Sequence, residues 1–192
     1  MNPIVLASQS PRRKQLLEWA EVPFDIIVKG TDESYPDGLR LEEIPVHIAR
    51  NKALAVQQSE LYKRYDKGNI ILAADTIVEL EGIIMGKPED AKEAIKMLME
   101  LSGKTHRVIT GVCILKHTDE FSFADVTEVE FHNITPGEIT YSVEQYQPFD
   151  KAGAYAIQEW IGVTGIKKIN GDFYNVMGLP VSRVVQKLAA IR

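Results

Sequence analysis

Short, largely apolar runs predict buried β-strands in the first half of the chain. These runs are Ile4–Ala7, Phe24–Val28 and Ile70–Ala74, the last of which ends at Asp75. Two segments between them carry apolar residues at three- and four-residue spacing, the period of an amphipathic helix. The first begins with Ser10 and Pro11, which favour the N-cap and the first helical position, and the second runs from about Pro45 to about Leu61. Alternating strands and helices are typical of an α/β fold.

The second half of the chain carries longer strand patterns and clear turn signals. Arg107–Lys116 and Phe121–Phe131 predict two long strands. Turn residues predict one hairpin within Glu79–Gly86, and a second in which Ile166–Ile169 and Phe173–Met177 flank an Asn-Gly-Asp turn. Helix starts are indicated at Pro88, at the capping box of Thr135 and Glu138, and at Pro180. The pattern predicts a mixed, twisted central sheet with flanking helices, in a single domain with two lobes around a cleft.

Charge narrows the classes of partner. The chain has 192 residues and a formal net charge of −5, from 22 Lys+Arg against 27 Asp+Glu. Polymeric nucleic acids and anionic membranes call for a broad basic surface, so this balance argues against both. Any anionic ligand must therefore be met by a few placed cations.

Two further observations bear on the compartment. The lone cysteine, Cys113, stands in an apolar run and predicts a buried small side chain, with neither an intramolecular disulfide nor a cysteine metal cluster. The longest fully apolar run, Ile70–Ala74, is far shorter than the ~20 residues of a membrane span, and the chain starts without a basic leader. We therefore expect a cytoplasmic protein.

The connection Ser8–Arg13 has the composition of an anion site. It joins a predicted buried strand to a helix start, where free backbone N–H groups and the helix dipole attract negative charge. Arg12 and Arg13 are unfavourable beside that positive end unless an anion binds there. Their guanidinium groups and the hydroxyl of Ser8 suit a phosphate, although two arginines that point into solvent would leave the same pattern.

Two charged residues stand within or directly after apolar patterns. Lys52 lies in the middle of the apolar arc of the helix from Pro45, where a charge is costly unless it faces a cleft or a partner. Snorkelling at the helix edge is the alternative. Asp75 follows an apolar strand, at the end where α/β sheets place their ligand crevice. Its carboxylate can take a proton from water or hold a divalent metal, or it can cap a turn.

Other polar positions join this set of candidates. Asp32 and Glu33 are carboxylates in a predicted loop, which can serve the same site or face solvent. Lys87 precedes Pro88 and repeats the placement of a cation at a helix start. Asp150–Gln158 is rich in Gly and Ala, which permit either close approach to a ligand or tight packing of the sheet. Within it, Lys151 offers a cation and Gln158 an amide that can read a base edge.

Taken together, these segments resemble the Maf family of nucleoside triphosphate pyrophosphatases. The resemblance spans nearly the whole chain in the family's order. It rests on Leu6–Arg13, Ala49–Ala53, Ala74–Val78, Gly86–Pro88, Leu101–Gly103, Asp150–Tyr155 and Gly171–Pro180. It implies an α/β fold related to the inosine triphosphate pyrophosphatases, with the active site between lobes. The chain departs from the family in having Ala156 where glycine is common, a change that concerns local backbone geometry only.

The resemblance also implies a reaction and a set of roles. A nucleoside triphosphate is hydrolysed to the monophosphate and pyrophosphate with a divalent metal, Mg²⁺ or Mn²⁺. By match to the family's motifs, Asp75 is the expected proton acceptor. From the residues themselves we hypothesise that Asp75 and Glu33 hold part of the metal's coordination shell. We further hypothesise that Arg13, Lys52 and Lys87 stabilise the leaving group, with Ser8 donating a hydrogen bond. The S-P-R-R, A-D-T and A-Y-x-I-Q forms are similar to the branch that acts on dTTP and UTP, where Arg12, Thr76 and Gln158 set base choice.

The cations Arg12, Arg13, Lys52, Lys87 and Lys151 are expected to converge on one small anion. Two other functions stay open from the sequence. One is the same reaction on 7-methyl-GTP or another modified nucleotide. The other is a non-catalytic nucleotide-binding regulator of septum formation, and the family is linked both to house-cleaning of nucleotides and to arrest of cell division. A homodimer is the default expectation for the assembly.

Overall fold

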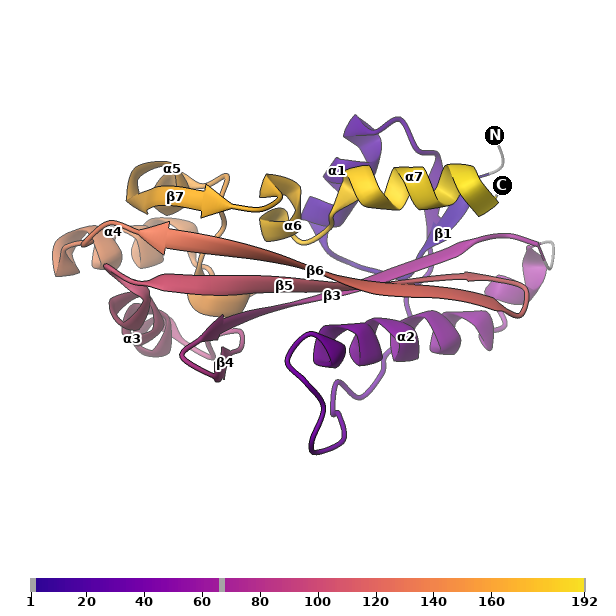
Figure 1. The fold of residues 1–192 in the computed structure, drawn as a ribbon, viewed down its shortest axis with the longest axis horizontal. Coiled ribbons are helices and arrows are strands. Elements are labelled where there is room, and N and C mark those ends of the chain that lie inside the picture. Colours follow the sequence, from indigo (N-terminus) through magenta and orange to yellow (C-terminus); the bar gives the residue numbers. More distant parts are fainter. Residues whose placement is uncertain (1–2, 66–67, 192) are drawn as a thin grey trace. The chain divides into compact units, whose positions relative to one another are not determined.

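The structure is a computed structural model that describes residues 3–65 and 68–191. The predicted fold class is confirmed: a mixed seven-stranded sheet is flanked by helices (Figure 1). Its strand order is β2-β1-β3-β5-β6-β7, and β4 pairs with β3. The chain divides into two compact units, and each unit draws on segments that are far apart in the sequence.

Unit 1 comprises Met1–Asp75, Thr110–Asp125 and Gly178–Arg192. In it, β1 (Ile4–Leu6) lies parallel to β2 (Phe24–Ile26) and to the first part of β3 (Ile71–Leu80). Its helices are α1 (Pro11–Trp19), α2 (Glu43–Gln57) and α7 (Val181–Ile191), with a short 3₁₀ turn at Tyr62–Arg64. Val5, Ala49, Ala53, Ile71 and Cys113 belong to its core, so Cys113 is the buried side chain that its sequence context predicts.

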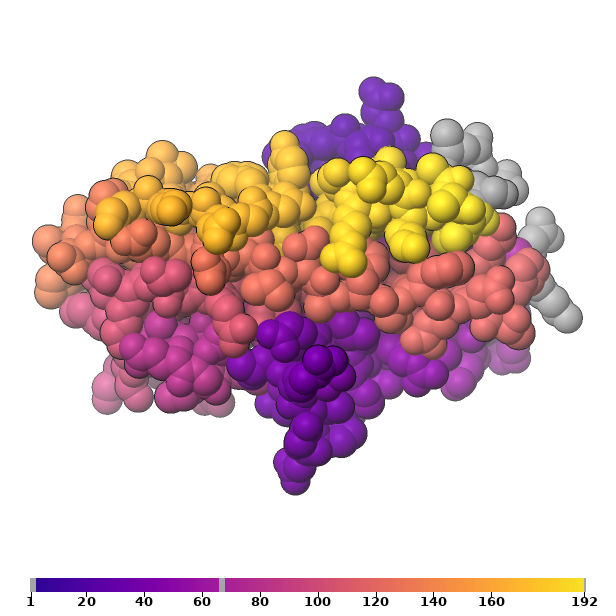
Figure 2. Space-filling model, viewed as in Figure 1, coloured from indigo at the N-terminus to yellow at the C-terminus, as the bar shows by residue number. Residues whose placement is uncertain are grey.

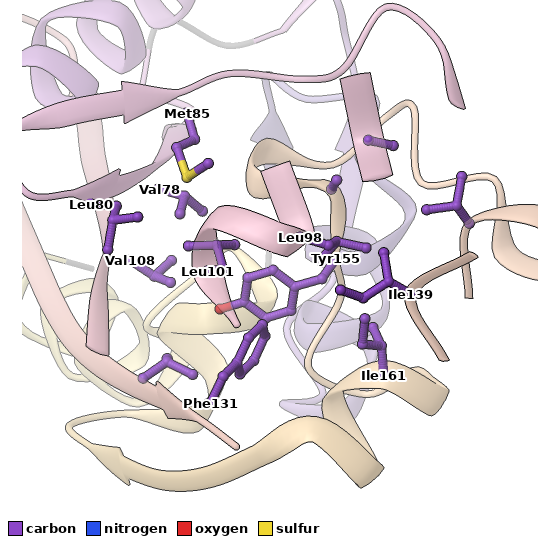
Figure 3. Close-up of a cluster of buried hydrophobic side chains, with 14 residues drawn as sticks. Val78, Leu80, Met85, Leu98, Leu101, Val108, Phe131, Ile139, Tyr155 and Ile161 are labelled. Atoms are coloured by element: carbon purple, nitrogen blue, oxygen red, sulfur yellow. The ribbon is translucent and has the colours of Figure 1, made fainter. Parts of the chain in front are cut away.

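Unit 2 comprises Thr76–Ile109 and Val126–Met177. It contains the rest of β3, and the remaining parts of β5 (Thr105–Lys116) and β6 (Asp119–Phe131), two strands that also contribute to unit 1. The strand β4 (Ile83–Met85) closes the predicted hairpin with β3, and β7 (Ile166–Asn170) runs antiparallel to β6. The helices are α3 (Ala91–Leu101), α4 (Pro136–Tyr146), α5 (Trp160–Gly165) and α6 (Phe173–Met177), with a 3₁₀ turn at Ala152–Ala154. Figure 3 shows its core, in which Tyr155 lies among Leu98, Leu101, Phe131 and Ile139.

The predicted caps are confirmed where side-chain chemistry decides them. Ser10 is the N-cap of α1, with Pro11 in the first position, and its hydroxyl accepts a hydrogen bond from the Arg13 N–H. Thr135 and Glu138 form the predicted capping box of α4, because each side chain accepts the other's backbone N–H. Each such cap satisfies N–H groups that have no partner within the helix.

Other predicted boundaries of helices and strands were wrong, two of them because a nearby carboxylate caps a helix. The helix predicted at Pro88 begins three residues later, because Asp90 accepts the Glu93 N–H and is the better N-cap. The predicted strand Phe173–Met177 is the helix α6, and the Asp172 carboxylate accepts the Tyr174 N–H at its start. The helix predicted over Pro45–Leu61 spans Glu43–Gln57 instead. Within the part of the chain that the structure describes, no helix has the length and apolar character to span a bilayer.

Gly111 in unit 1 is required by a close approach between β5 and α2. A Cβ at this position would lie 2.2 Å from the carbonyl carbon of Pro45 and 2.2 Å from the backbone nitrogen of Val46. Because backbone atoms cannot rotate away, we expect Gly111→Ala to lower the free energy of unfolding by about 3 kcal/mol. Gly137→Ala is the matched control, since no atom lies within 4 Å of its added methyl group. Urea unfolding of both variants tests this, and equal stabilities would contradict it.

Candidate active site

The connection between β1 and α1 builds one side of the candidate site in unit 1. Arg13 is buried, and its Nε donates to the carbonyl oxygen of Gly178 at 2.8 Å. Its Nη1 donates to the Ser8 hydroxyl at 3.1 Å, which also accepts the Ser10 N–H at 3.2 Å. Arg13 therefore does not point into solvent, and the guanidinium is held in place by groups of the connection and by Gly178.

The electrostatics of Arg13 link it to two carboxylates. Burial lowers the pKa of Arg13 most, and the negative charges of Asp75 and Glu33 oppose that shift. The neighbouring Arg12 adds to the lowering as a like charge. Because such Coulombic effects act at short range, Arg13, Glu33 and Asp75 form one charged cluster. The sequence predicted these three residues as parts of one site, and in unit 1 they lie together. Arg12, predicted for the same site, is half-buried and affects Arg13 as its neighbour in the chain.

Lys52 is the centre of this cluster. Its ammonium donates to Asp75 Oδ1 at 2.7 Å and pairs with Glu33 Oε1 at 2.7 Å. The side chains of Lys52 and Asp75 are only 18% and 13% exposed, whereas Glu33 is 54% exposed. Lys52 therefore does not snorkel to solvent: its charge, in the apolar arc of α2, is compensated by two carboxylates. Glu33 comes from the exposed loop that precedes α2, which projects from the surface of unit 1 (Figure 2).

The backbone around Asp75 differs from the prediction. We expected the strand to end at Asp75, but β3 continues to Leu80 because its later residues pair with β4. The strand that does end here is β1. Its last residue, Leu6, lies opposite Leu72 of the parallel strand β3. Asp75 therefore lies just beyond the carboxyl end of β1, where the chain turns into the Ser8–Arg13 connection. Ligands bind at such ends in α/β sheets.

The predicted site residues of unit 2 have their own surroundings. Lys87 is exposed and precedes α3 by several residues, so it is not at a helix start as predicted. Thr76 is half-buried on β3. Lys151 is buried and pairs with Asp150 at 2.8 Å and Glu159 at 3.3 Å, so two carboxylates already compensate its charge. The convergence of Lys87 and Lys151 with the cations of unit 1 on one anion stays a prediction.

Gln158 has an unusual side-chain amide. Its Oε1 is buried and accepts no hydrogen bond from any of the residues that the structure describes. A buried polar atom without a partner is costly in a folded protein. An amide left in this state is a candidate contact for a polar group of a ligand.

Two buried polar pairs in unit 2 were not predicted from the sequence. Glu79 accepts hydrogen bonds from the Arg107 guanidinium and from the Gly82 N–H of the β3–β4 turn. His106 and Tyr155 share a hydrogen bond of 2.7 Å between Nε2 and the phenol oxygen. The only available signal was a polar residue inside an apolar strand pattern. The partner of each is too distant in the sequence for a pattern to reveal it.

Burial of His106 makes the stability of the protein depend on pH. Desolvation lowers its pKa from 6.5 to about 4. Between these pH values His106 is therefore protonated in the unfolded chain but neutral in the folded protein. Stability is therefore complete above pH 6.5 and falls as the pH drops towards 4. We expect this residue to remove about 2 kcal/mol between pH 7 and pH 5.

Urea unfolding of the wild type and of His106→Gln at both pH values measures this loss. The carboxylates titrate in both proteins, so the difference between them isolates the histidine. A wild-type protein that loses no more stability than the variant would contradict the expectation.

The carboxylates of unit 1 also define what cation the site can hold. Among residues 3–65 and 68–191, no group of three or more His, Cys, Asp or Glu side chains is placed to hold a metal ion. Glu33 and Asp75 nevertheless present two carboxylates to one ammonium. One or two carboxylates, completed by the phosphates of a substrate, are what Mg²⁺ commonly uses in proteins. The residues therefore fit a metal that arrives with a phosphate ligand, and not a closed protein cage.

The fold and this cluster define an α/β protein with a buried arginine at a strand-to-helix connection, beside two carboxylates bridged by a lysine. The chain belongs to the family described as Maf-like proteins, whose family profile matches residues 3–191.

Several relatives are similar over almost the whole chain. A dTTP/UTP pyrophosphatase of Phocaeicola vulgatus is 47% identical over 96% of this chain and 94% of its own length. Proteins of the same name from Cytophaga hutchinsonii and Bacteroides fragilis are 51% and 48% identical. Each alignment covers 96% of this chain, and 82% and 94% of the respective relative.

Proposed function

We propose that this protein hydrolyses dTTP and UTP to the nucleoside monophosphate and pyrophosphate. The observation that carries the proposal is the cluster in which Lys52 contacts both Asp75 and Glu33 beside the buried Arg13. The names of relatives at 44–51% identity support the choice of substrate.

The cations of unit 1 account for binding of a triphosphate. The guanidinium of Arg13 is already oriented by its bonds to Gly178 and Ser8, so little side-chain entropy is lost when a phosphate binds. The Ser8 oxygen accepts two hydrogen bonds, which leaves its proton to donate to a phosphate oxygen. Arg12 adds a second guanidinium at the start of α1. These groups place fixed positive charge where the leaving pyrophosphate gains negative charge.

Asp75 is the residue we assign as proton acceptor. A water molecule attacks the α-phosphorus, and its proton passes to the Asp75 carboxylate. The bond between the α-phosphorus and the oxygen that bridges to the β-phosphorus breaks, and pyrophosphate leaves with that electron pair. Lys52 holds Asp75 in position through the bond to Oδ1. A carboxylate fixed in this way can act as a general base without reorganisation.

A divalent cation, Mg²⁺ or Mn²⁺, belongs to the same proposal. Asp75 and Glu33 would hold it together with the triphosphate, and it would supply Lewis-acid neutralisation of the phosphate charge. In that state Lys52 would share the two carboxylates with the cation. Its ammonium could then also contact the phosphates.

Base choice is assigned to Arg12, Thr76 and Gln158. The buried Oε1 of Gln158 has no partner among the described residues. This supports its assignment, because an amide oxygen can accept a hydrogen bond from the N3–H that thymine and uracil share. Lys87 and Lys151 are proposed as further contacts of the triphosphate.

A panel of nucleotides with product identification tests the proposed function. We expect dTTP and UTP to yield monophosphate and pyrophosphate at rates well above those for ATP, GTP and CTP. Chelation of divalent cations should abolish turnover. Preferred hydrolysis of 7-methyl-GTP would move the activity to a modified nucleotide. Retention of every triphosphate unchanged in the presence of Mg²⁺ and Mn²⁺ would instead indicate a nucleotide-binding regulator and overturn the proposal.

A further inference from the structure

A buried aromatic cluster in unit 2 contains a hydrogen bond that the proposed reaction does not use. Tyr155 and His106 are 6% and 1% exposed, and 2.7 Å separates the phenol oxygen from Nε2. Both rings meet Phe131 edge to face, with ring centroids 5.0 and 5.1 Å away. In Figure 3 the Tyr155 ring lies beside that of Phe131, enclosed by the apolar side chains of α3 and α4. Among the residues that the structure describes, the hydrogen-bond partner of the phenol in this apolar setting is His106.

The hydrogen bond fixes the end of a strained turn. Directly before Tyr155, Gly153 and Ala154 have φ angles of 68° and 61°, and Ala154 is a non-glycine residue in the left-handed region. Such a conformation costs about 1 kcal/mol or more and persists only where the surroundings impose it. Gly153 donates its N–H to the Gly86 carbonyl at 3.0 Å, and an added Cβ would press on Val78 at 3.0 Å. The turn is therefore held on one side by Gly86 and Val78, and on the other by the bond to His106.

Gln158 follows this turn after a single buried stretch. Ala156 and Ile157, which join it to Tyr155, are 5% and 3% exposed, and the Ala156 carbonyl accepts the Glu159 N–H at 3.1 Å. Because the stretch is short and packed, a shift of Tyr155 is passed on to Gln158. The Oε1 of Gln158 is a buried atom that accepts no hydrogen bond from the described residues. Small errors in the position of such an atom weaken a hydrogen bond strongly.

We propose that His106 and Tyr155 are positioning residues for base recognition: their hydrogen bond holds the 152–155 turn and thereby sets the Gln158 amide against the base of the substrate. This inference rests on the proposed function, because it concerns how that substrate is selected. Neither His106 nor Tyr155 touches the substrate. The phenol oxygen acts on Gln158 through the backbone that joins them, so its removal lowers the discrimination between bases.

Tyr155→Phe tests the proposal, because it removes one oxygen and keeps the ring that fills the core. We expect KM for dTTP and UTP to rise about fivefold to tenfold with kcat nearly unchanged, as one buried hydrogen bond predicts. KM for CTP, whose base lacks the N3–H, should stay within about twofold, so the preference for UTP over CTP should fall by the same factor as the affinity.

Tyr62→Phe is the matched control. Tyr62 is 8% exposed in unit 1, and its hydroxyl donates one hydrogen bond to the Asn69 carbonyl at 2.6 Å. Its loss should lower the melting temperature about as much as Tyr155→Phe and leave the UTP-to-CTP ratio unchanged. His106→Phe should match Tyr155→Phe, the double variant should show no further loss of preference, and His106→Gln, whose amide can bond the phenol, should restore part of it.

Binding of α,β-methylene analogues of UTP and CTP gives a readout that does not need turnover. If the wild type binds the UTP analogue selectively but releases no pyrophosphate, the proposed function fails while the positioning proposal is still decided by the analogue affinities of Tyr155→Phe. An unchanged preference in that variant overturns the proposal. Equal weakening for both bases, or the same weakening in Tyr62→Phe, overturns it too, and so does a wild type that binds neither analogue.

Discussion

Asp75→Asn should lower pyrophosphate release from dTTP by about 10³-fold or more, within the usual contribution of a positioned general base together with its place at a metal site. The substitution keeps the shape of the side chain. The amide oxygen can still accept the hydrogen bond that Lys52 donates to Oδ1, so the cluster stays assembled. What is lost is the site that takes the proton of the attacking water. KM for dTTP should therefore change less than kcat.

Asp125→Asn is the control for this variant. Asp125 also lies in unit 1, it is 24% exposed, and it pairs with Arg183 at 3.6 Å. The same chemical change at this position should leave pyrophosphate release within about twofold of the wild type. Steady-state assays at saturating Mg²⁺ and Mn²⁺, with circular dichroism to verify folding, make the comparison. An Asp75→Asn enzyme with near-normal kcat would show that another group accepts the proton.

Lys52→Met should lower kcat/KM for dTTP by about 10²-fold to 10³-fold, the usual effect of removing one fixed charge that stabilises a transition state. Methionine keeps much of the length and the apolar stem of lysine. The change leaves Asp75 and Glu33 without the ammonium that both contact at 2.7 Å. Because removal of one partner leaves a mostly buried charge unpaired, the variant should also be less stable than the wild type.

Two further variants separate these effects. Glu33→Gln in the Lys52→Met background should recover part of the stability, because it removes one of two facing like charges, but it should not recover activity. Lys14→Met changes a lysine in an exposed pair with Glu18, at 3.7 Å, and should alter neither property. A Lys52→Met enzyme with full kcat/KM would contradict the role of Lys52 in the site.

Much of the candidate site in unit 1 could be predicted because its residues violate local patterns. Lys52 interrupts an apolar arc, and two arginines stand at a helix start that repels cations. Each violation needs a compensating partner, and Asp75, Glu33 and Ser8 are those partners. Helix caps could be predicted from local sequence too, since Ser10 and Thr135 each act on a backbone group three residues away.

What could not be predicted depends on pairings between distant segments. The continuation of β3 beyond Asp75 is decided by β4, and polarity at a single position carries no information about it. The Asn-Gly-Asp turn led to a helix, not a second strand, because Asp172 bonds both to Thr127 and to the start of α6. His106 and Tyr155 are 49 residues apart, and nothing in the segment of either residue indicates the other as its partner.

The isotope position after hydrolysis of UTP in H₂¹⁸O tests the central claim most directly. Attack of water on the α-phosphorus, with Asp75 as proton acceptor, places one ¹⁸O in UMP and none in pyrophosphate. Mass spectrometry of the two products from the wild-type enzyme with Mg²⁺ distinguishes the alternatives. We predict that the label is found in UMP alone. Label in pyrophosphate would mean attack at the β-phosphorus, and formation of UDP and phosphate would mean a different reaction, so either result would contradict the account.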